Sequence, residues 1–145
     1  MKSAAPAAKL ADTLIFAPNM PQTNAAFSVF CLCAEWCGTC REYRSGFEEV
    51  SARFPGARFH WVDIENQADV LGDIDIENFP TLLINRGSSV LYYGVMLPYP
   101  EHLARILDSF HEQDAQQSAA YALAHPERRQ WQEDDDLREL IAHFS

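Results

Sequence analysis

The chain has 145 residues, a length that fits one domain with room for an appendage. Apolar residues make up 48% of it, which is enough to bury a core without disulfide staples or a structural metal. A disordered chain and a cysteine-knit miniprotein are therefore excluded. The formal net charge of −10 argues against binding to nucleic acid or to an anionic membrane surface.

The N-terminal region and the longest apolar run bear on where the protein works. Residues 1–13 are rich in Ala and Pro, and we expect them to be a flexible segment. Lys9 and Asp12 interrupt this segment before an apolar block develops, which makes it a poor signal peptide. The longest strongly apolar run, 27–34, is too short to span a bilayer. We therefore expect a cytosolic protein that enters no membrane.

The first predicted elements alternate between strand and helix. A weak strand candidate spans 13–16, and a stronger one spans 26–34, with apolar residues on both faces as in a central strand. A helix should begin near Cys37, with apolar residues at helical spacing, and should stop at Pro55. The next strand spans 58–64, so this order predicts two parallel strands joined by a right-handed helical crossover.

The following segment contributes a hairpin and another helix. A short helix is expected over 68–71. Two strands, 81–84 and 90–93, are separated by a turn in which Gly87 can take a left-handed conformation. A helix then begins at Pro100, with apolar residues on one face. Together these elements predict an α/β fold with a central mixed β-sheet flanked by helices.

Residues 111–145 differ in character from the rest and form an acidic C-terminal extension. They hold eight acidic residues against three arginines, so they carry half of the net negative charge. Acidic residues complement the dipole at a helix start, and the apolar residues after them have helical spacing, so 134–144 is predicted to be an amphipathic helix. Packing on its own domain is the default for this helix. Binding of a partner protein through its apolar stripe is the alternative.

Four cysteines lie within ten positions: Cys31, Cys33, Cys37 and Cys40. A secreted disulfide framework would spread them along the chain, so the cluster indicates a metal site or redox chemistry. Cys37 and Cys40 follow the predicted central strand directly, at the start of the long helix. The unpaired N–H groups and partial positive charge of a helix N-terminus favour a thiolate, which is the attacking species in disulfide exchange.

The position of each thiol on the helix suggests its role. Cys37 lies nearer the exposed edge and is the predicted nucleophile. Cys40, one turn further in, is expected to be buried and to resolve the mixed disulfide with a substrate. Gly38 permits a tight turn and the approach of a substrate backbone. The pair would then cycle between a dithiol and a Cys37–Cys40 disulfide, with no other cofactor and no metal.

The remaining two cysteines are open to several interpretations. Both lie on the predicted strand, should point to the same face of the sheet, and are expected to be small core side chains. A zinc site made by all four cysteines would require the helix start to fold down onto that face. Alternatively, Cys31 lies behind the active pair and acts as a third redox thiol.

Two motifs carry a family resemblance. Residues 34–41, with the sequence AEWCGTCR, closely resemble the active-site segment of the thioredoxin family, and the FPT at 79–81 resembles its cis-proline loop. The patterns at 62–65 and 93–95 match its third strand and last loop at suitable distances. The resemblance covers about residues 14–110 and implies a thioredoxin fold there, followed by the C-terminal helical extension.

The resemblance also implies a substrate-docking surface. In this family the proline of the FPT loop is cis and faces the active-site sulfurs, which implies a cis bond before Pro80. Phe79 would offer its backbone to an extended substrate segment, with Thr81 next in the same loop. Trp36 and Gly94 would complete a shallow, mainly apolar surface.

Three positions depart from the family pattern. Thr39 replaces the proline that usually follows the glycine, which should make the pair more oxidising. Cys31 stands where thioredoxins usually carry a buried Asp, and Trp61 stands in the place of its partner lysine. Proton transfer from Cys40 must then use water, Cys31 or another route. We expect slower turnover than in a typical thioredoxin.

These observations predict a thiol–disulfide oxidoreductase that serves electron transport and cell redox homeostasis, acting as a reductase. Its substrates would be protein disulfides, and an external thiol reductant such as a thioredoxin-reductase-like donor would regenerate it. The competing hypothesis is a binding or chaperone module that acts through the C-terminal extension, which the missing Asp and Lys favour. An exported oxidase or isomerase is disfavoured by the N-terminus.

Overall fold

The computed structural model describes residues 26–74 and 76–144. The expected flexible segment 1–13 and the strand candidate 13–16 therefore lie outside the described residues. The elements are, in chain order, β1 (Phe27–Cys33), α1 (Gly38–Arg53), β2 (Arg58–Asp63), α2 (Ala68–Leu71), β3 (Thr81–Arg86), β4 (Ser89–Val95), α3 (Pro100–His111), α4 (Ala115–Leu123), α5 (Pro126–Glu133) and α6 (Asp135–His143). Within these ranges, no helix combines the length and the apolar character needed to cross a membrane.

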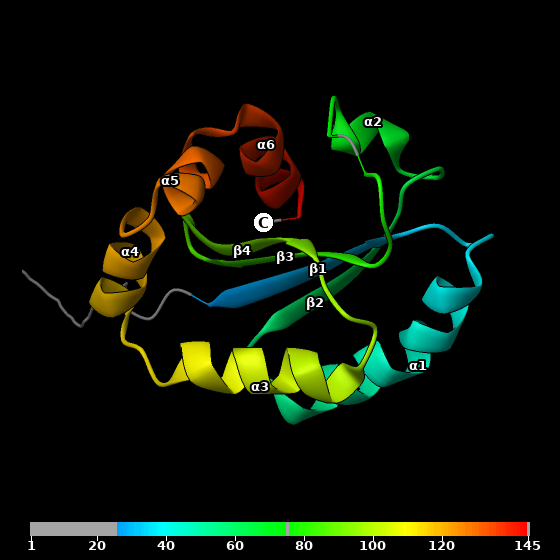
Figure 1. Ribbon diagram of the computed structural model, residues 1–145, viewed down its shortest axis with the longest axis horizontal. Helices are drawn as coiled ribbons and strands as arrows, with labels where there is room; N and C mark the ends of the chain where they lie inside the picture. The colour runs from blue at the N-terminus through cyan, green and yellow to red at the C-terminus, as the bar shows by residue number, and fades with distance from the viewer. Residues whose placement is uncertain (1–25, 75, 145) are drawn as a thin grey trace, which may run out of the picture.

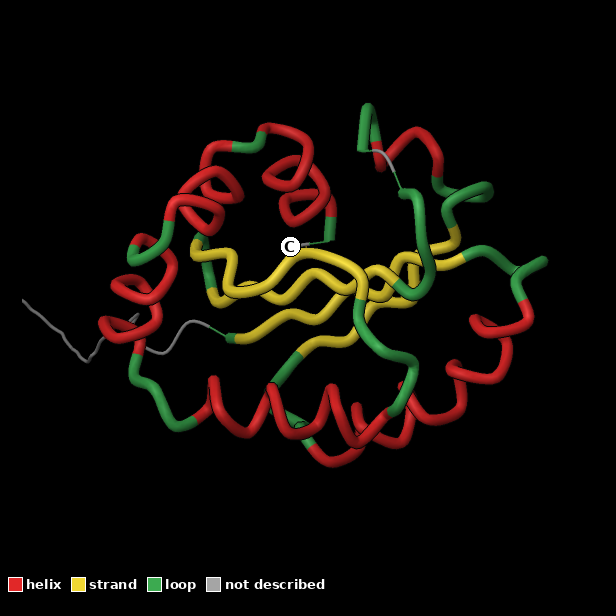
Figure 2. The backbone as a smooth tube through the Cα atoms, viewed as in Figure 1, coloured by secondary structure: helices red, strands yellow, loops and turns green. Residues whose placement is uncertain are grey.

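The four strands form one mixed sheet in the order β2-β1-β3-β4 (Figure 1). β1 and β2 run parallel and are connected through α1, whereas β1 with β3 and β3 with β4 are antiparallel. Helices lie on both sides of the sheet (Figure 2). The predicted α/β fold with a central mixed sheet is confirmed, and Gly87 in the β3–β4 turn has the left-handed conformation expected, with φ of 57°.

The helices α1 and α3 cover one face of the sheet, below the strands in Figure 1. Alternate residues of β1 point to this face, among them Cys31 and Cys33, and the cluster there also includes Cys40 from the first turn of α1. The start of α1 therefore rests on the face to which both strand cysteines point. α1 and α3 approach closely at Gly46, where a Cβ atom would lie 2.2 Å from Pro100 Cγ.

The opposite face is covered by α2, α5 and α6 (Figure 1). Phe30 and Leu32 of β1 point to this side and share a buried cluster with Leu137 and Leu140 of α6. The helix α6 lies within the segment predicted to be amphipathic. The hypothesis that its apolar stripe binds a partner protein is wrong for these two leucines, because both are buried against the protein's own sheet.

Two helices of the C-terminal extension, α4 and α5, were not among the predicted elements. α4 begins with a capping box in which the Asp114 side chain accepts from the Gln117 N–H and the Gln117 side chain accepts from the Asp114 N–H. The Gln132 side chain, at the end of α5, accepts from the Val90 N–H and donates to the Val90 carbonyl, both at 2.8 Å. These bonds satisfy polar groups of β4, the edge strand of the sheet.

Candidate functional site

Cys37 lies at the N-terminal end of α1, where it is the N-cap residue with an extended backbone (φ −84°, ψ 122°). Its N–H donates to the Ala34 carbonyl at 3.0 Å, and its own carbonyl accepts from the Arg41 N–H at 3.1 Å. Its thiol makes no capping hydrogen bond, forms no disulfide and is partly exposed. The local structure therefore presents a free thiol at the helix N-terminus, as expected for Cys37.

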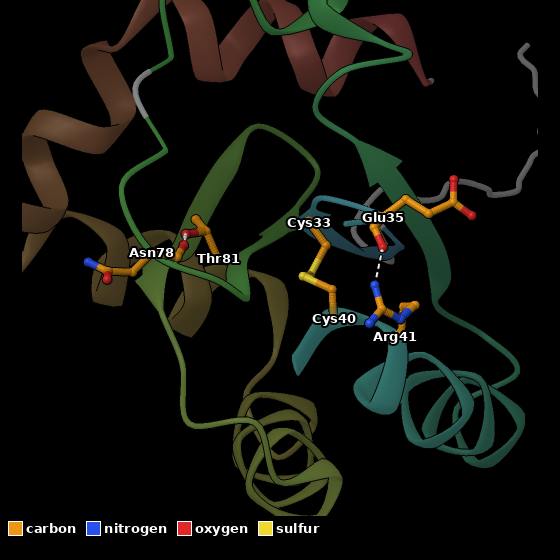
Figure 3. The surroundings of a disulfide bond; sticks show 6 residues. All are labelled: Cys33, Glu35, Cys40, Arg41, Asn78 and Thr81. Atoms are coloured by element: carbon orange, nitrogen blue, oxygen red, sulfur yellow. Dashed lines mark hydrogen bonds between the residues drawn. A yellow bond between two sulfur atoms is a disulfide. The ribbon is translucent and has the colours of Figure 1, made fainter. Parts of the chain in front are cut away.

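The disulfide of the site joins Cys33 to Cys40 (Figure 3). The Cα atoms of these residues are 5.8 Å apart, and both side chains are 1% exposed. The expected Cys37–Cys40 disulfide is therefore not the one in this structure. Cys33 lies in the core, as expected, but it is disulfide-bonded there, which the sequence analysis did not predict. The physical reason is that the start of α1 packs on the sheet face to which the side chain of Cys33, the last residue of β1, points.

Cys31 lies two residues before Cys33 on the same face of β1, is fully buried and is a free thiol. Burial raises the pKa of the Cys31 thiol far above its ordinary value, so the neutral thiol is the form present at neutral pH. The Tyr43 hydroxyl is buried too. Its pKa is raised by burial and, secondly, by the repulsion that an ionised Cys31 would add. Neither group is therefore a ready base for a proton leaving Cys40.

The loop before β3 carries the other predicted residues of the site. The Phe79–Pro80 peptide bond is cis, and Pro80 is buried. The Thr81 hydroxyl donates to the Asn78 carbonyl at 2.7 Å (Figure 3). The Phe79 ring meets the Trp36 ring edge to face, with 5.5 Å between centroids. The structure thus brings the segment before α1 and the loop before β3 together, as the resemblance implied.

An exposed apolar surface lies beside this loop. Trp36 is 61% exposed, and three further exposed large apolar residues lie at the end of β4 and just beyond it: Val95, Leu97 and Tyr99. Val95 pairs with Thr81 across the β3–β4 ladder. Gly94 has φ of 153°, a conformation that L side chains rarely adopt. Of these residues, sequence reasoning included Val95 in the last-loop pattern but did not single out Leu97 and Tyr99. The signal was their position between a strand and a proline-started helix, where no amphipathic pattern accounts for them.

A cavity of about 410 Å³ borders Cys40. Trp61, the residue in place of the family lysine, forms part of its wall, and the Arg44 guanidinium lies 5.1 Å from the centroid of the Trp61 ring. The Arg41 side chain donates to the Glu35 carbonyl at 2.9 Å (Figure 3). The full lining comprises Ala34, Glu35, Cys40, Arg41, Arg44, Trp61, Asp63, Asn66 and Gln67.

The zinc interpretation of the four cysteines requires four free thiolates, but two of them are joined in a disulfide. Among the residues that the structure describes, no group of three or more His, Cys, Asp or Glu is placed to hold a metal ion. A partly exposed thiol at Cys37 and a disulfide at Cys40 are groups that can take part in thiol–disulfide exchange.

Comparison with known proteins gives a family and a fold. The family model described as Thioredoxin matches residues 16–98. A thioredoxin H-type from Oryza sativa subsp. indica is 40% identical over 50 residues, which are 34% of this chain and 41% of the relative. A thioredoxin H-type from Picea mariana is 40% identical over 58 residues, 39% of this chain and 46% of the relative. The chain thus spans less than half the length of these curated relatives.

Solved structures give the same fold. The thioredoxin from Trypanosoma brucei brucei superposes with a TM-score of 0.55 at 24% identity, covering 63% of this chain and 80% of that one. The Plasmodium falciparum thioredoxin superposes with a TM-score of 0.53 at 20% identity, covering 61% and 85%. At these identities the likeness concerns the fold alone.

Proposed function

The chain belongs to the thioredoxin family, and on that premise we propose that it is a thiol–disulfide oxidoreductase that reduces protein disulfides through Cys37 and Cys40. One observation carries the proposal. A free, partly exposed thiol lies at the N-cap position of α1, and the cysteine three residues further on is itself held in a disulfide. An accessible nucleophile close in sequence to a second cysteine that can form a disulfide is the arrangement that exchange requires.

The reaction starts from the reduced protein. The Cys37 thiolate attacks one sulfur of the substrate disulfide, forms a mixed disulfide and releases the other substrate sulfur as a thiolate, which takes up a proton. Cys40 then attacks the Cys37 Sγ, and the substrate leaves fully reduced. The cycle closes when an external thiol reductant, such as a thioredoxin-reductase-like donor, returns two electrons to the protein.

The surface around Cys37 suits an extended segment of an unfolded or flexible substrate. Trp36 and Phe79 contribute apolar area on one side. Gly94, with no side chain, leaves room for a substrate backbone near Pro80 and the Thr81–Val95 pair. Such a surface recognises backbone and apolar groups and so accepts many protein disulfides. A cytosolic location stays a prediction that cell fractionation tests.

Reduction of insulin disulfides by dithiothreitol, with the full chain as catalyst, tests the proposal. We expect Cys37→Ser to abolish catalysis, because no other partly exposed thiol is present in the described residues. Cys40→Ser should accumulate a mixed disulfide at Cys37, since nothing resolves it there. Cys31→Ser is the matched control and should retain activity, because that thiol is buried and unbonded. Activity that survives Cys37→Ser would overturn the proposal.

A further inference from the structure

Cys40 has two candidate disulfide partners, one on β1 and one at the start of its own helix. Cys33, at the end of β1, is bonded to it in this structure (Figure 3). Cys37 precedes it by three residues and caps the same helix. Since a sulfur atom holds one disulfide partner at a time, the two bonds exclude one another. The two possible partners of Cys40 differ in exposure: Cys33 is 1% exposed, whereas Cys37 is partly exposed to solvent.

We propose that Cys33 is a third redox-active residue. Once a substrate has been reduced, Cys33 replaces Cys37 as the disulfide partner of Cys40. The oxidised protein then holds its disulfide in the core and keeps a free thiol at Cys37. The inference rests on the proposed function, since Cys37 and Cys40 must first form a disulfide in the catalytic cycle.

The exchange needs no outside oxidant or reductant. The Cys33 thiolate attacks the Cys40 Sγ of the Cys37–Cys40 disulfide. The Cys33–Cys40 bond forms, the Cys37–Cys40 bond breaks, and Cys37 leaves as a thiolate. The negative charge passes from Cys33 to Cys37, and the proton lost by Cys33 goes to solvent or to Cys37. No electrons enter or leave, so the protein stays oxidised by two electrons.

The surroundings of the sulfur atoms favour this direction. A disulfide is uncharged, so burying it beside Cys31 among apolar side chains carries no cost of desolvating a charge. A thiolate is charged and is better placed at Cys37, which is partly exposed and lies at the N-terminus of α1. After the exchange the uncharged disulfide lies in the core, and the ionisable thiol is the partly exposed one at Cys37.

The consequence is that Cys37 controls both entry to and exit from the buried state. A protein reductant cannot reach Cys33 or Cys40, each 1% exposed. Reduction must begin when Cys37 attacks the Cys40 Sγ and restores the Cys37–Cys40 bond. The reductant then attacks the Cys37 Sγ and Cys40 leaves. Meanwhile the oxidised protein retains its nucleophile and can still form mixed disulfides.

Differential alkylation of the full chain tests the pairing directly. Reduced protein is mixed with insulin, quenched in acid, labelled with N-ethylmaleimide at free thiols, then reduced and labelled with iodoacetamide. All four cysteines lie in the single tryptic peptide 10–41, so fragment ions report the label on each. We expect maleimide at Cys31 and Cys37 under denaturing labelling, and iodoacetamide at Cys33 and Cys40.

Variants at the two strand cysteines separate the proposal from its alternatives. In Cys33→Ser, Cys40 has Cys37 as its partner, so maleimide labelling of Cys37 in the oxidised protein should fall by about tenfold or more. A tenfold preference for Cys33 equals about 30 mV, so the reduction potential should become less negative by that amount. Cys31→Ser, a buried cysteine on the same strand face, should change neither readout. Cys33→Ala repeats the test in case a buried hydroxyl disturbs folding.

Two results would overturn the inference. One is iodoacetamide at Cys37 and Cys40 in the oxidised wild type, with an unchanged potential in Cys33→Ser and Cys33→Ala. The other is a Cys33–Cys40 bond that stays closed while insulin is being reduced, which would make it a static disulfide. In the first case retained insulin reduction leaves the proposed function standing. In the second case the resolving role of Cys40 falls together with the inference, and only the role of Cys37 as nucleophile is left. Loss of insulin reduction by the wild type would instead remove the proposed function, and the inference with it.

Discussion

The environment of each sulfur atom gives the four cysteines different chemistry, although they lie within ten positions. Cys31 is enclosed by the core, and burial raises its pKa, so it stays a neutral thiol. Cys33 and Cys40 share a bond that removes both from titration. Cys37 alone among the described cysteines is both free and partly exposed. Reactivity therefore follows from position on β1 and α1 rather than from residue type.

How much of this could be read from the sequence depends on whether a property is local. The exposure of Cys37 and the burial of Cys40 follow from their places on one helix, and both were predicted. The Cys33–Cys40 bond depends on where the start of α1 lands on the sheet, a tertiary relation that spacing does not contain. For the same reason the sequence predicts a small core side chain at Cys33 and does not predict its disulfide bond.

His60 gives a pH dependence that belongs to a single residue. Its ring lies 4.8 Å from the Phe30 ring and 4.7 Å from the Phe144 ring, centroid to centroid. Burial, and then the charge of Arg58, lower its pKa below the ordinary 6.5. The unfolded chain thus binds the proton first as the pH falls. The contribution of neutral His60 to the free energy of unfolding is fully present above about pH 6.5. It declines as the pH falls from there to the lower pKa of the folded state.

Urea unfolding at about pH 7.5 and about pH 5.5 measures this effect. We expect the free energy of unfolding to be lower at the acidic value in the wild type. His60→Phe keeps an aromatic ring against Phe30 and Phe144 but cannot titrate, so its decline should be smaller. Equal declines in the two proteins would assign the pH dependence to other groups.

At the scale of elements, the predictable ones are those with a strong apolar pattern. α1 is predictable because residues spaced along its length are buried against the core. It ends at Arg53, close to the stop predicted at Pro55. α5 buries no residue completely, and α4 buries only Ser118 and Ala122 among the residues described. Helices that line a sheet edge leave little hydrophobic periodicity to detect. Their caps, at Asp114 and before Pro126, were the available signal.

The contact between α1 and α3 makes a prediction of its own. A Cβ at Gly46 would lie 2.2 Å from Pro100 Cγ, so Gly46→Ala must push the two helices apart. We expect a loss of about 1–3 kcal/mol in the free energy of unfolding, although alanine is the better helix former. Gly56→Ala is the control, since its Cβ would meet no atom within 4 Å. Equal stabilities in denaturant unfolding of the two variants would contradict this packing.

In the whole molecule, the cysteines lie on one face of the sheet and helix α6 of the C-terminal extension packs on the other. The face covered by α1 and α3 holds all four cysteines, while the face covered by α2, α5 and α6 holds a second apolar cluster. The C-terminal extension thus supplies part of the core. It would follow that removing α6 uncovers Phe30, Leu32 and Leu83 on the sheet rather than deleting an independent recognition element.

Leu140 allows this division to be tested. It is fully buried on α6, so Leu140→Ala should lower the free energy of unfolding by about 2–5 kcal/mol. The same substitution at Leu123, which is 57% exposed on α4, should change stability by less than about 0.5 kcal/mol. Well below the unfolding transition, both variants should reduce insulin at the wild-type rate, because the cysteines lie across the sheet.

If the extension instead bound a partner protein, the opposite result would be expected for Leu140→Ala. A stripe kept for a partner must be open in the free protein, so Leu140→Ala would leave stability unchanged and weaken only the partner complex. Loss of stability with intact disulfide exchange would assign α6 to the fold. A leucine exposed on the surface contributes little to folding. Unchanged stability in Leu140→Ala would therefore contradict the packing of α6 on the sheet and indicate that its apolar residues are exposed.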